Sequence, residues 1–271
     1  PAVQKAIFRS LLPHPRLMAW AVKPAVLAKK MGLVGLAKKT GLMGLVYGNL
    51  PKAEGILQDI PLQTFAERLG KLKLTPDKVD HRVAYFNSCG FNYALPAVAE
   101  STVKVLVRNH CAVEVKDNNC CGLPPWSYGD IEAAKNLARA NIRAFESSAA
   151  EAILTDCGSC SSFLREYAHL LADDPEYQER AAAFGAKIRD VSEYLVSIGV
   201  TAPSGEIACT VTYHDPCHLS RPGNIKAQPR SLIKGIKGVT FQELPEADWC
   251  CGGAGTYNVA HYDQSMQVLD R

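Results

Sequence analysis

Hydrophobic and polar positions alternate in blocks that predict strands and helices in turn after residue 80. Short apolar runs predict strands at residues 82–86, 112–115, 152–155, 208–213 and 239–243. Apolar residues at helical spacing predict helices between them, at residues 94–109, 130–148, 161–171, 192–198 and 228–236. Because short strands alternate with helices, the pattern favours parallel βαβ units.

Residues 1–75 follow a different pattern and contain no cysteine. Residues 5–12 and 16–28 have helical character. We expect three prolines to interrupt these helices, because proline lacks the backbone N–H that a helix interior needs. They are Pro13, Pro15 and Pro24.

An imperfect repeat then occurs, in which residues 38–45 echo residues 29–36. It predicts either a surface or partner-binding helix that is basic on one side and apolar on the other, or two short helices that pack closely through glycine. The second interpretation is favoured because glycine lowers helix propensity. Residues 51–76 are interpreted as a linker with one short helix at 62–69.

The fold predicted from these patterns is α/β, with two pseudo-symmetric parallel-sheet βαβ lobes behind a helical N-terminal extension. We expect the extension and linker to cover residues 1–76, the first lobe 77–190 and the second lobe 191–271. The chain begins at Pro1 without a methionine and stops inside the helical pattern of residues 257–271. The second lobe is therefore expected to be truncated at its C-terminus.

Composition and charge exclude several classes of protein. The net charge of +3 is too small to indicate nucleic-acid binding, and no run of lysine or arginine exceeds two residues. No apolar stretch approaches the length of about 18 residues that a transmembrane helix needs, and the first residues do not resemble an export signal. Ten cysteines in such a chain suggest a metal or cluster site in a reducing compartment. We therefore expect a cytoplasmic protein, with peripheral association at the inner face of the membrane as an option.

Eight of the cysteines form two sets with matching spacing: Cys89, Cys120, Cys121, Cys157 and Cys160, then Cys217, Cys250 and Cys251. Thirty residues separate the lone cysteine from the adjacent pair in the first set, and 32 residues do so in the second. Each pair is followed by glycine, Gly122 or Gly252. Glycine permits positive φ and leaves backbone N–H groups free to bond cluster sulfides.

The cysteines follow predicted parallel strands, whose carboxyl ends share one edge of a sheet, so the thiols of the first set should converge there. Adjacent cysteines suit a multi-iron cluster better than one small ion, and five thiols exceed the four ligands of zinc. A thioredoxin-like pair at Cys157 and Cys160 would leave the other cysteines unexplained. Cys111 and Cys209 lie outside the repeat and are interpreted as buried core thiols.

Two histidines, His214 and His218, flank Cys217. We expect them to hydrogen-bond to the loop and position it, with a ligand or proton-transfer role as the alternative. Asp215 and Pro216 are expected to shape the turn before Cys217, and Trp249 to pack beside the second cysteine pair.

The complete pattern, Cys-x(30)-Cys-Cys-Gly-x(34)-Cys-Gly-Ser-Cys with a second copy ending in Trp-Cys-Cys-Gly-Gly, resembles the CCG cysteine-rich domains. These domains occur in the cysteine-rich component of heterodisulfide reductase and in the iron–sulfur subunits of glycolate oxidase, lactate dehydrogenase and anaerobic glycerol-3-phosphate dehydrogenase. The resemblance covers roughly residues 80–271. The proline-rich start at residues 11–16 is most similar to the glycolate oxidase subunit.

The resemblance implies that all eight cysteines of the two sets bind an iron–sulfur cofactor of the 4Fe–4S type, with zinc as the alternative at one site. It implies an electron-transfer subunit of a flavin-linked 2-hydroxy-acid dehydrogenase, acting on glycolate or lactate. Its partners would be a flavoprotein and a further iron–sulfur subunit or domain, with electrons passed toward quinone. No nucleic-acid partner is implied.

Two departures from the family pattern leave other functions open. No ferredoxin-type Cys-x-x-Cys-x-x-Cys motif is present, and the closing element of the second copy would fall at about residue 287, beyond Arg271. A cluster-based disulfide reductase and a zinc-stabilised structural or interaction protein remain as alternatives.

Overall fold

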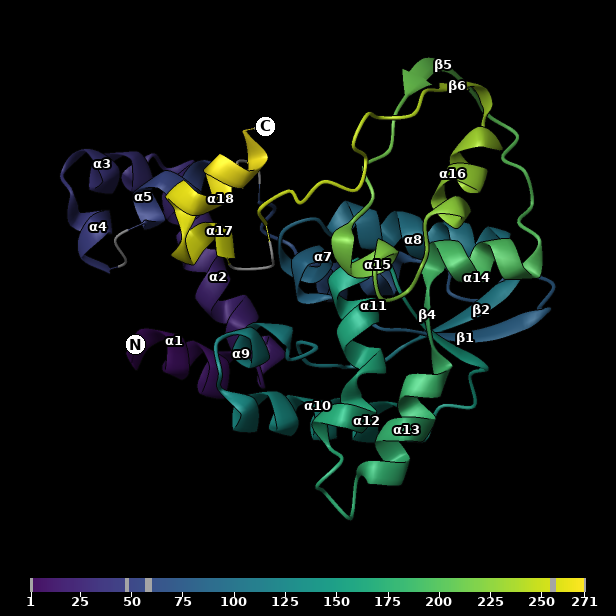
Figure 1. The fold of residues 1–271 in the computed structure, drawn as a ribbon, viewed down its shortest axis with the longest axis horizontal. Helices are drawn as coiled ribbons and strands as arrows, with labels where there is room; N and C mark the ends of the chain where they lie inside the picture. Colours follow the sequence, from purple (N-terminus) through teal and green to yellow (C-terminus); the bar gives the residue numbers. More distant parts are fainter. Residues whose placement is uncertain (1, 47–48, 57–59, 254–256, 271) are drawn as a thin grey trace.

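A four-stranded parallel sheet forms the centre of the molecule (Figure 1). The computed structural model describes residues 2–46, 49–56, 60–253 and 257–270. The strands are β1 (His81–Tyr85), β2 (Cys111–Val115), β3 (Ala152–Thr155) and β4 (Ile188–Asp190). Their order is β2-β1-β3-β4, and every neighbouring pair is parallel. The predicted α/β class and parallel pairing are confirmed.

Two apolar cores cover the two faces of this sheet, because successive side chains of a strand point to opposite faces. Ala84 and Phe86 face one core, whereas Val83 and Tyr85 face the other. The helices that cover the sheet alternate with its strands along the chain. They are α7 (Cys89–Tyr93), α8 (Pro96–Arg108), α9 (Leu123–Ser127), α10 (Ile131–Glu146), α11 (Gly158–Arg165), α12 (Tyr167–Leu170), α13 (Gln178–Lys187) and α14 (Val191–Ile198).

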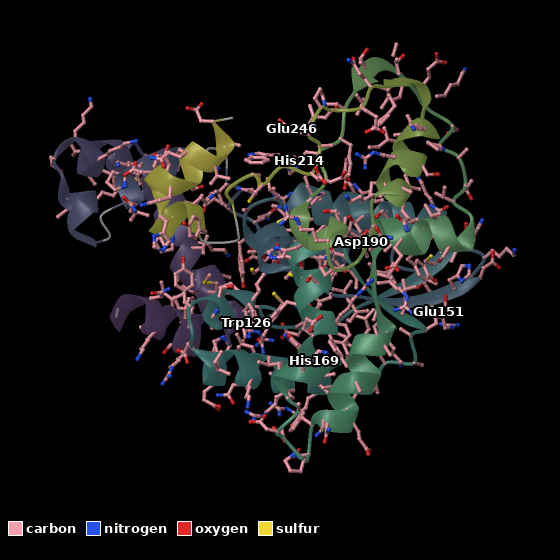
Figure 2. The ribbon with its side chains drawn as sticks, in the orientation of Figure 1. Trp126, Glu151, His169, Asp190, His214 and Glu246 are labelled. Carbon is pink, nitrogen blue, oxygen red and sulfur yellow. The ribbon has the colours of Figure 1, made fainter. Side chains whose placement is uncertain are left out.

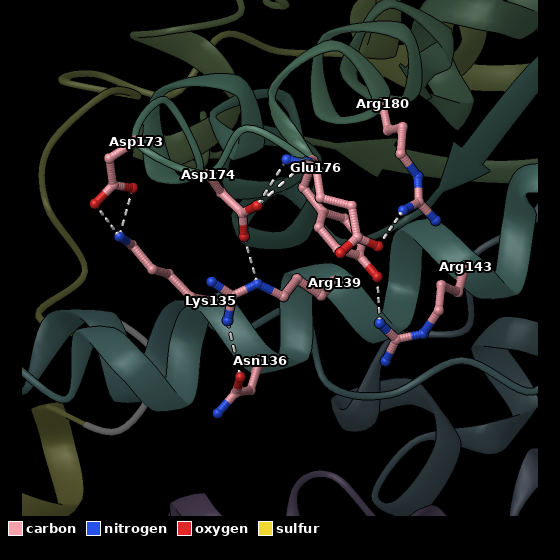
Figure 3. A network of polar contacts seen from close by, with 9 residues as sticks. Lys135, Asn136, Arg139, Arg143, Asp173, Asp174, Glu176 and Arg180 are labelled. Carbon is pink, nitrogen blue, oxygen red and sulfur yellow. Dashed lines mark hydrogen bonds and ion pairs between the residues drawn. The ribbon is translucent and has the colours of Figure 1, made fainter.

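Helix α10 forms because its apolar residues share one face and Asp130 caps its first turn by accepting a hydrogen bond from the Ala133 N–H. Its polar face is tied to the segment at residues 173–180 (Figure 3). Lys135 binds Asp173 and Arg139 binds Asp174, while Arg143 donates to the hydroxyl of Tyr177. These contacts hold α10 against the part of the chain that leads into α13.

The N-terminal extension is helical, as predicted, with α1 (Ala2–Ala6), a π-helical turn at Ile7–Leu11, α2 (Pro15–Lys30), α3 (Leu33–Lys39), α4 (Leu42–Val46) and α5 (Leu50–Ala53). The prediction that Pro24 breaks the helix is wrong, because α2 runs through it. The carbonyl that loses its partner to Pro24 belongs to Trp20, whose side chain is 77% exposed. Water can therefore satisfy that exposed turn.

The repeat at residues 29–45 forms two short helices, α3 and α4. Gly32 and Gly41 precede them with φ of 77° and 75°, which the missing Cβ allows. Gly35 and Gly44 have open space where a Cβ would stand, so among the residues that the structure describes no neighbour packs closely against these two glycines. In the linker, α6 (Phe65–Arg68) begins with a capping box and buries Phe65 completely.

The second cysteine set lies in a smaller unit with its own parallel pair of strands, β5 (Glu206–Val211) and β6 (Lys237–Phe241). Its helices are α15 (Cys217–Ser220), α16 (Ala227–Lys234), α17 (Tyr257–Ala260) and α18 (Tyr262–Leu269). The order of elements repeats that of the first copy: strand, cysteine helix, helix, strand, Cys-Cys-Gly, short helix, longer helix. The limits of the two lobes at residues 77–190 and 191–271 stay predictions, and α14 packs against both β4 and α16.

The C-terminal helices lie beside the N-terminal extension (Figure 1). The Asn49 side-chain amide donates to the Ala260 carbonyl at 2.9 Å, and Lys52 pairs with Asp263 at 2.7 Å. Across the described ranges, no helix combines the length and apolar character needed to cross a bilayer.

Candidate functional site

The thiols of the first cysteine set lie at the carboxyl edge of the central sheet. Cys89 is the first residue of α7, which follows β1, and Cys157 precedes α11, which follows β3. Cys120 and Cys121 lie between β2 and α9. The turns after β1, β2 and β3 all lie at the carboxyl edge of the sheet, and they are neighbours because β1 lies between β2 and β3. From β1 the chain first adds β2 on one side and then β3 on the other, so this is the switch point of the sheet.

All five thiols of this set form one chain of neighbours. Cys89 donates a hydrogen bond to Cys120, and Cys120 donates to Cys121. From the other side, Cys160 lies within hydrogen-bonding reach of both Cys121 and Cys157. The structure thus places the thiols of these three turns next to one another.

The hydrogen bonds among the five thiols lower the pKa of two of them and raise the pKa of the other three. Donation from Cys120 and then Cys160 lowers the pKa of Cys121 to about 6, from an ordinary 9.0. Donation from Cys160 lowers the pKa of Cys157 to about 7. The same contacts raise the pKa of Cys89, Cys120 and Cys160. A lowered pKa favours the thiolate, which is the form in which cysteine binds metal.

Backbone N–H groups at two helix starts also point at the sulfurs. The amides of Gly122 and Leu123 bond Cys120 and Cys121, while those of Ser159 and Cys160 bond Cys157. These amides are free because the first N–H groups of a helix have no partner within it. Their positive dipole end lowers the thiol pKa and would equally stabilise cluster sulfides.

The donor set fits a polynuclear cluster. The five neighbouring thiols include two adjacent cysteines, and backbone amides bond the sulfurs of Cys120, Cys121 and Cys157. Within the described parts of the chain, no group of three or more His, Cys, Asp or Glu side chains is positioned to hold a metal ion in this structure. A cluster with several iron atoms can use neighbouring sulfurs on different atoms, whereas tetrahedral zinc needs four ligands around one point.

The second cysteine set is more open. Cys217 and Cys250 are half-buried and Cys251 is exposed. Gly252 adopts a φ of 68°, so its position matches that of Gly122, whose φ is 95°. Residues 252–271 contain no further cysteine.

In both copies, the loop of the lone cysteine is joined to the loop of the Cys-Cys pair by a backbone N–H two residues before the lone cysteine. Asn87 lies two residues before Cys89, and its N–H donates to the side chain of Asn118 at 3.0 Å. In the second copy the N–H of Asp215 donates to the Ala247 carbonyl at 2.7 Å. This shared bond between loops supports the repeat that the spacing predicted.

Polar side chains of the second copy fix its loops, as predicted. His214 pairs through Nε2 with the Trp249 carbonyl at 2.8 Å, which joins the loop of Cys217 to that of Cys250. The carboxylate of Asp215 is buried and accepts two hydrogen bonds from Arg230, at 2.6 and 3.0 Å.

The two copies meet where α15 packs on α11. His218 Nδ1 lies 2.9 Å from Ser159 Oγ, between Cys157 and Cys160 in sequence. A Cβ on Gly158 would lie 3.1 Å from the Cβ of Leu219, so a larger residue there would force α15 to move slightly away from α11. The second copy thus covers the helix that carries the closing cysteines of the first.

A cavity of about 560 Å³ lies beside this contact, and its lining includes His218, Ser159 and the aromatic side chain of Phe163. Trp126 and His169, both labelled in Figure 2, line it from the first copy.

The remaining cysteines differ from each other. Cys111 is fully buried in the core on the opposite face of the sheet, and burial raises its pKa to about 11. Its prediction as a core thiol is confirmed. Cys209 lies exposed on β5, so the same prediction for it is wrong. Most side chains of β5 and β6 are exposed to solvent, so a position on this strand pair does not bury Cys209.

Sequence reasoning missed two residues of the site, Asn141 and Tyr167. Both are fully buried and bind the backbone of the Cys120–Cys121 loop. Asn141 could have been found from the sequence, because it is a polar residue on the apolar face of a predicted helix, between Ala138 and Ile142.

Comparison with known proteins matches two families. The CCG cysteine-rich domain model covers residues 83–165 and 211–271. A model for the linker region of the glycolate oxidase iron–sulfur subunit covers residues 1–57.

Among curated proteins, the probable glycolate oxidase iron–sulfur subunit of Bacillus subtilis is 35% identical over 271 residues. The match takes in 99% of this chain and 61% of that protein, so this chain spans about three fifths of its length. Lactate utilization protein A of an Exiguobacterium species is 35% identical over 190 residues, which are 69% of this chain and 78% of that protein. The same protein of Bacillus cytotoxicus is 34% identical over 191 residues, with shares of 70% and 79%. The chain therefore belongs to the family of proteins that carry the CCG cysteine-rich domain, in two copies.

Proposed function

We propose that this chain is the iron–sulfur electron-transfer subunit of a flavin-linked dehydrogenase that oxidises a 2-hydroxy acid of the glycolate or lactate type. The observation that carries the proposal is the buried line of five thiols at the sheet edge, with backbone amides directed at its sulfurs. Relatives named as a glycolate oxidase iron–sulfur subunit and as lactate utilization proteins support it.

The first cysteine set would hold a cluster of the 4Fe–4S type through Cys89, Cys120, Cys121, Cys157 and Cys160. Such a cluster supplies reversible one-electron chemistry, and its potential depends on burial and on hydrogen bonds to its sulfurs. The residues of this chain bury the site and aim amides at it. The second set, Cys217, Cys250 and Cys251, would hold another cluster, or zinc, once a closing ligand is supplied.

Substrate oxidation would take place on a partner flavoprotein, because no flavin or nicotinamide motif is recognised in this sequence. A further iron–sulfur subunit or domain would complete the path of electrons toward quinone. Both partners are proposals, since the chain spans only part of the length of its Bacillus subtilis relative.

We also propose a cytoplasmic location with peripheral contact to the membrane through the N-terminal helices. Residues 1–53 contain no acidic residue and nine basic ones: Lys5, Arg9, Arg16, Lys23, Lys29, Lys30, Lys38, Lys39 and Lys52. Large apolar side chains in the same helices are exposed, including Trp20, Leu27, Met31, Leu36 and Leu42. Basic helices that also expose tryptophan and leucine are suited to an anionic lipid surface.

The experiment that tests the function is purification without oxygen, followed by iron, acid-labile sulfide and zinc analysis. We expect a brown protein with iron and sulfide. Cys160→Ser should lose most of the iron, because a hydroxyl replaces a thiolate ligand poorly. Cys111→Ser is the matched control, since it also removes a buried thiol but from the opposite core, and it should keep the iron. A colourless protein with stoichiometric zinc and no sulfide would contradict the proposal.

A second candidate, a cluster-based disulfide reductase, is favoured by the cavity lined by His218 and by Ser159, which lies between Cys157 and Cys160 in sequence. Turnover of small disulfides by the reduced protein, with no electron transfer from a flavoprotein, would favour this candidate instead.

A further inference from the structure

The loop that carries Cys120 and Cys121 is held by two fully buried polar side chains. Asn141 comes from the middle of α10, and Tyr167 begins α12. Burying an amide or a hydroxyl is unfavourable unless it is hydrogen-bonded, so these side chains need partners within the protein.

Their partners are three consecutive residues of the cysteine loop. Asn141 accepts a hydrogen bond from the Asn119 N–H at 2.9 Å and donates to the Cys120 carbonyl at 3.0 Å. Tyr167 donates to the Cys121 carbonyl at 2.6 Å. Asn141 also donates to the Tyr167 hydroxyl at 3.0 Å, which joins the two side chains. The Asn119 N–H requires an acceptor, so it fixes the orientation of the Asn141 amide.

We propose that Asn141 and Tyr167 are positioning residues of the cysteine site. By fixing the peptide groups on both sides of Cys121, and the one that precedes Asn119, they set the directions of two adjacent side chains, which would otherwise vary with the backbone torsions of the loop. The thiols of Cys120 and Cys121 are then presented to Cys89 and Cys160, and the amide of Gly122 faces the Cys120 sulfur. The cluster that the cysteines would hold rests on the proposed function, whereas the hydrogen bonds to the loop do not.

The chain offers two matched controls. Tyr177 is buried in the same core as Tyr167, but its hydroxyl accepts from Arg143 and touches no cysteine loop. Asn109 is buried like Asn141 and also bridges two backbone groups, as it donates to the Val105 carbonyl and accepts from the Thr201 N–H. Tyr177→Phe and Asn109→Leu therefore remove equivalent bonds away from the site.

The experiment compares Tyr167→Phe and Asn141→Leu with these controls in two measurements. In metal-free protein, hydrogen exchange of the peptide that contains residues 119–122 should become about tenfold faster in the two site variants, and stay unchanged in the controls, because one or two loop bonds are lost. In anaerobically loaded protein, the electron paramagnetic resonance spectrum of the reduced state should shift in Tyr167→Phe and not in Tyr177→Phe.

The two measurements separate this inference from the proposed function. Unchanged exchange in both site variants, with thermal melts lowered as in the controls, would show that the two side chains only stabilise the core. Faster exchange in a protein that binds no iron would uphold the positioning role and refute the cluster. Should Asn141→Leu not fold, Tyr167→Phe decides the question alone, since a phenyl ring fills the same space.

Discussion

Replacing Gly122 with alanine should destabilise the protein more than the same change at Gly90 or Gly129. These are the other glycines of the first CCG copy that lie outside α11 and α13. Gly122 has a φ of 95°, and a Cβ there would lie 3.3 Å from the Ala134 carbonyl oxygen and 3.4 Å from the Phe163 ring. A left-handed backbone costs a non-glycine residue about 1–2 kcal/mol. Forcing a methyl group into a packed core adds about 1–3 kcal/mol. We therefore expect a loss of about 2–5 kcal/mol in the free energy of unfolding.

Two other glycines separate these causes. Gly129 has a φ of 77° but open space around its Cβ position, so Gly129→Ala should show the backbone cost alone, about 1–2 kcal/mol. Gly90 has neither a positive φ nor a neighbour, and it lies in α7, so Gly90→Ala should be neutral or stabilising by about 0.5–1 kcal/mol.

Urea unfolding of the reduced, metal-free protein, followed by circular dichroism, measures all three values. The order of destabilisation should be Gly122→Ala, then Gly129→Ala, then Gly90→Ala. If Gly122→Ala cost no more than Gly129→Ala, the reasoning about crowding behind the cysteine pair would be refuted.

Three further predictions concern charge. In metal-free protein the pKa of Cys121 is lowered to about 6, so its thiolate should absorb in the ultraviolet at neutral pH, and this absorption should be absent from Cys121→Ser. The ionised thiol contributes to folding stability in full above the ordinary thiol pKa of 9.0, and this contribution is lost as the pH falls through about 6. Arg230→Met should lower the free energy of unfolding by about 3–5 kcal/mol, because the buried Asp215 carboxylate loses its cation; a loss below about 1 kcal/mol in urea titrations would contradict this. Binding to vesicles with anionic lipid should weaken by about 2 kcal/mol when Lys30 and Lys39 are both changed to glutamine, and equal binding to neutral vesicles would argue against a lipid surface.

The sequence alone determined the α/β alternation and the placement of the first cysteine set after successive strands. Parallel strands end at one edge of a sheet, so cysteines that follow strands at 82–86, 112–115 and 152–155 were expected at one edge. The strand order, with β1 between β2 and β3, is what makes them neighbours there. The role of the glycine after each cysteine pair could also be predicted from the sequence, because Cys-Cys-Gly occurs twice at similar spacing. Both Gly122 and Gly252 do adopt positive φ.

Local patterns were insufficient where the deciding partner is remote. The strand β4 has only three residues, and it forms because it pairs with β3 after the chain passes through α13. Pro24 was expected to end a helix, yet α2 continues because the affected turn faces solvent. The burial of Cys209 depends on what covers β5, and within the described residues that strand remains largely exposed.

The supports of the site were decided by tertiary structure alone. Asn141 and Tyr167 are 26 residues apart and meet only because α10 and α12 pack behind the cysteine loop. His218 reaches Ser159 across 59 positions because Gly158 lets α15 approach α11 closely. A sequence pattern records which thiols can share a sheet edge, since that depends on periodicity along the chain. Which polar groups hold those thiols in place depends on three-dimensional packing, because a hydrogen bond is decided by distance and direction in space.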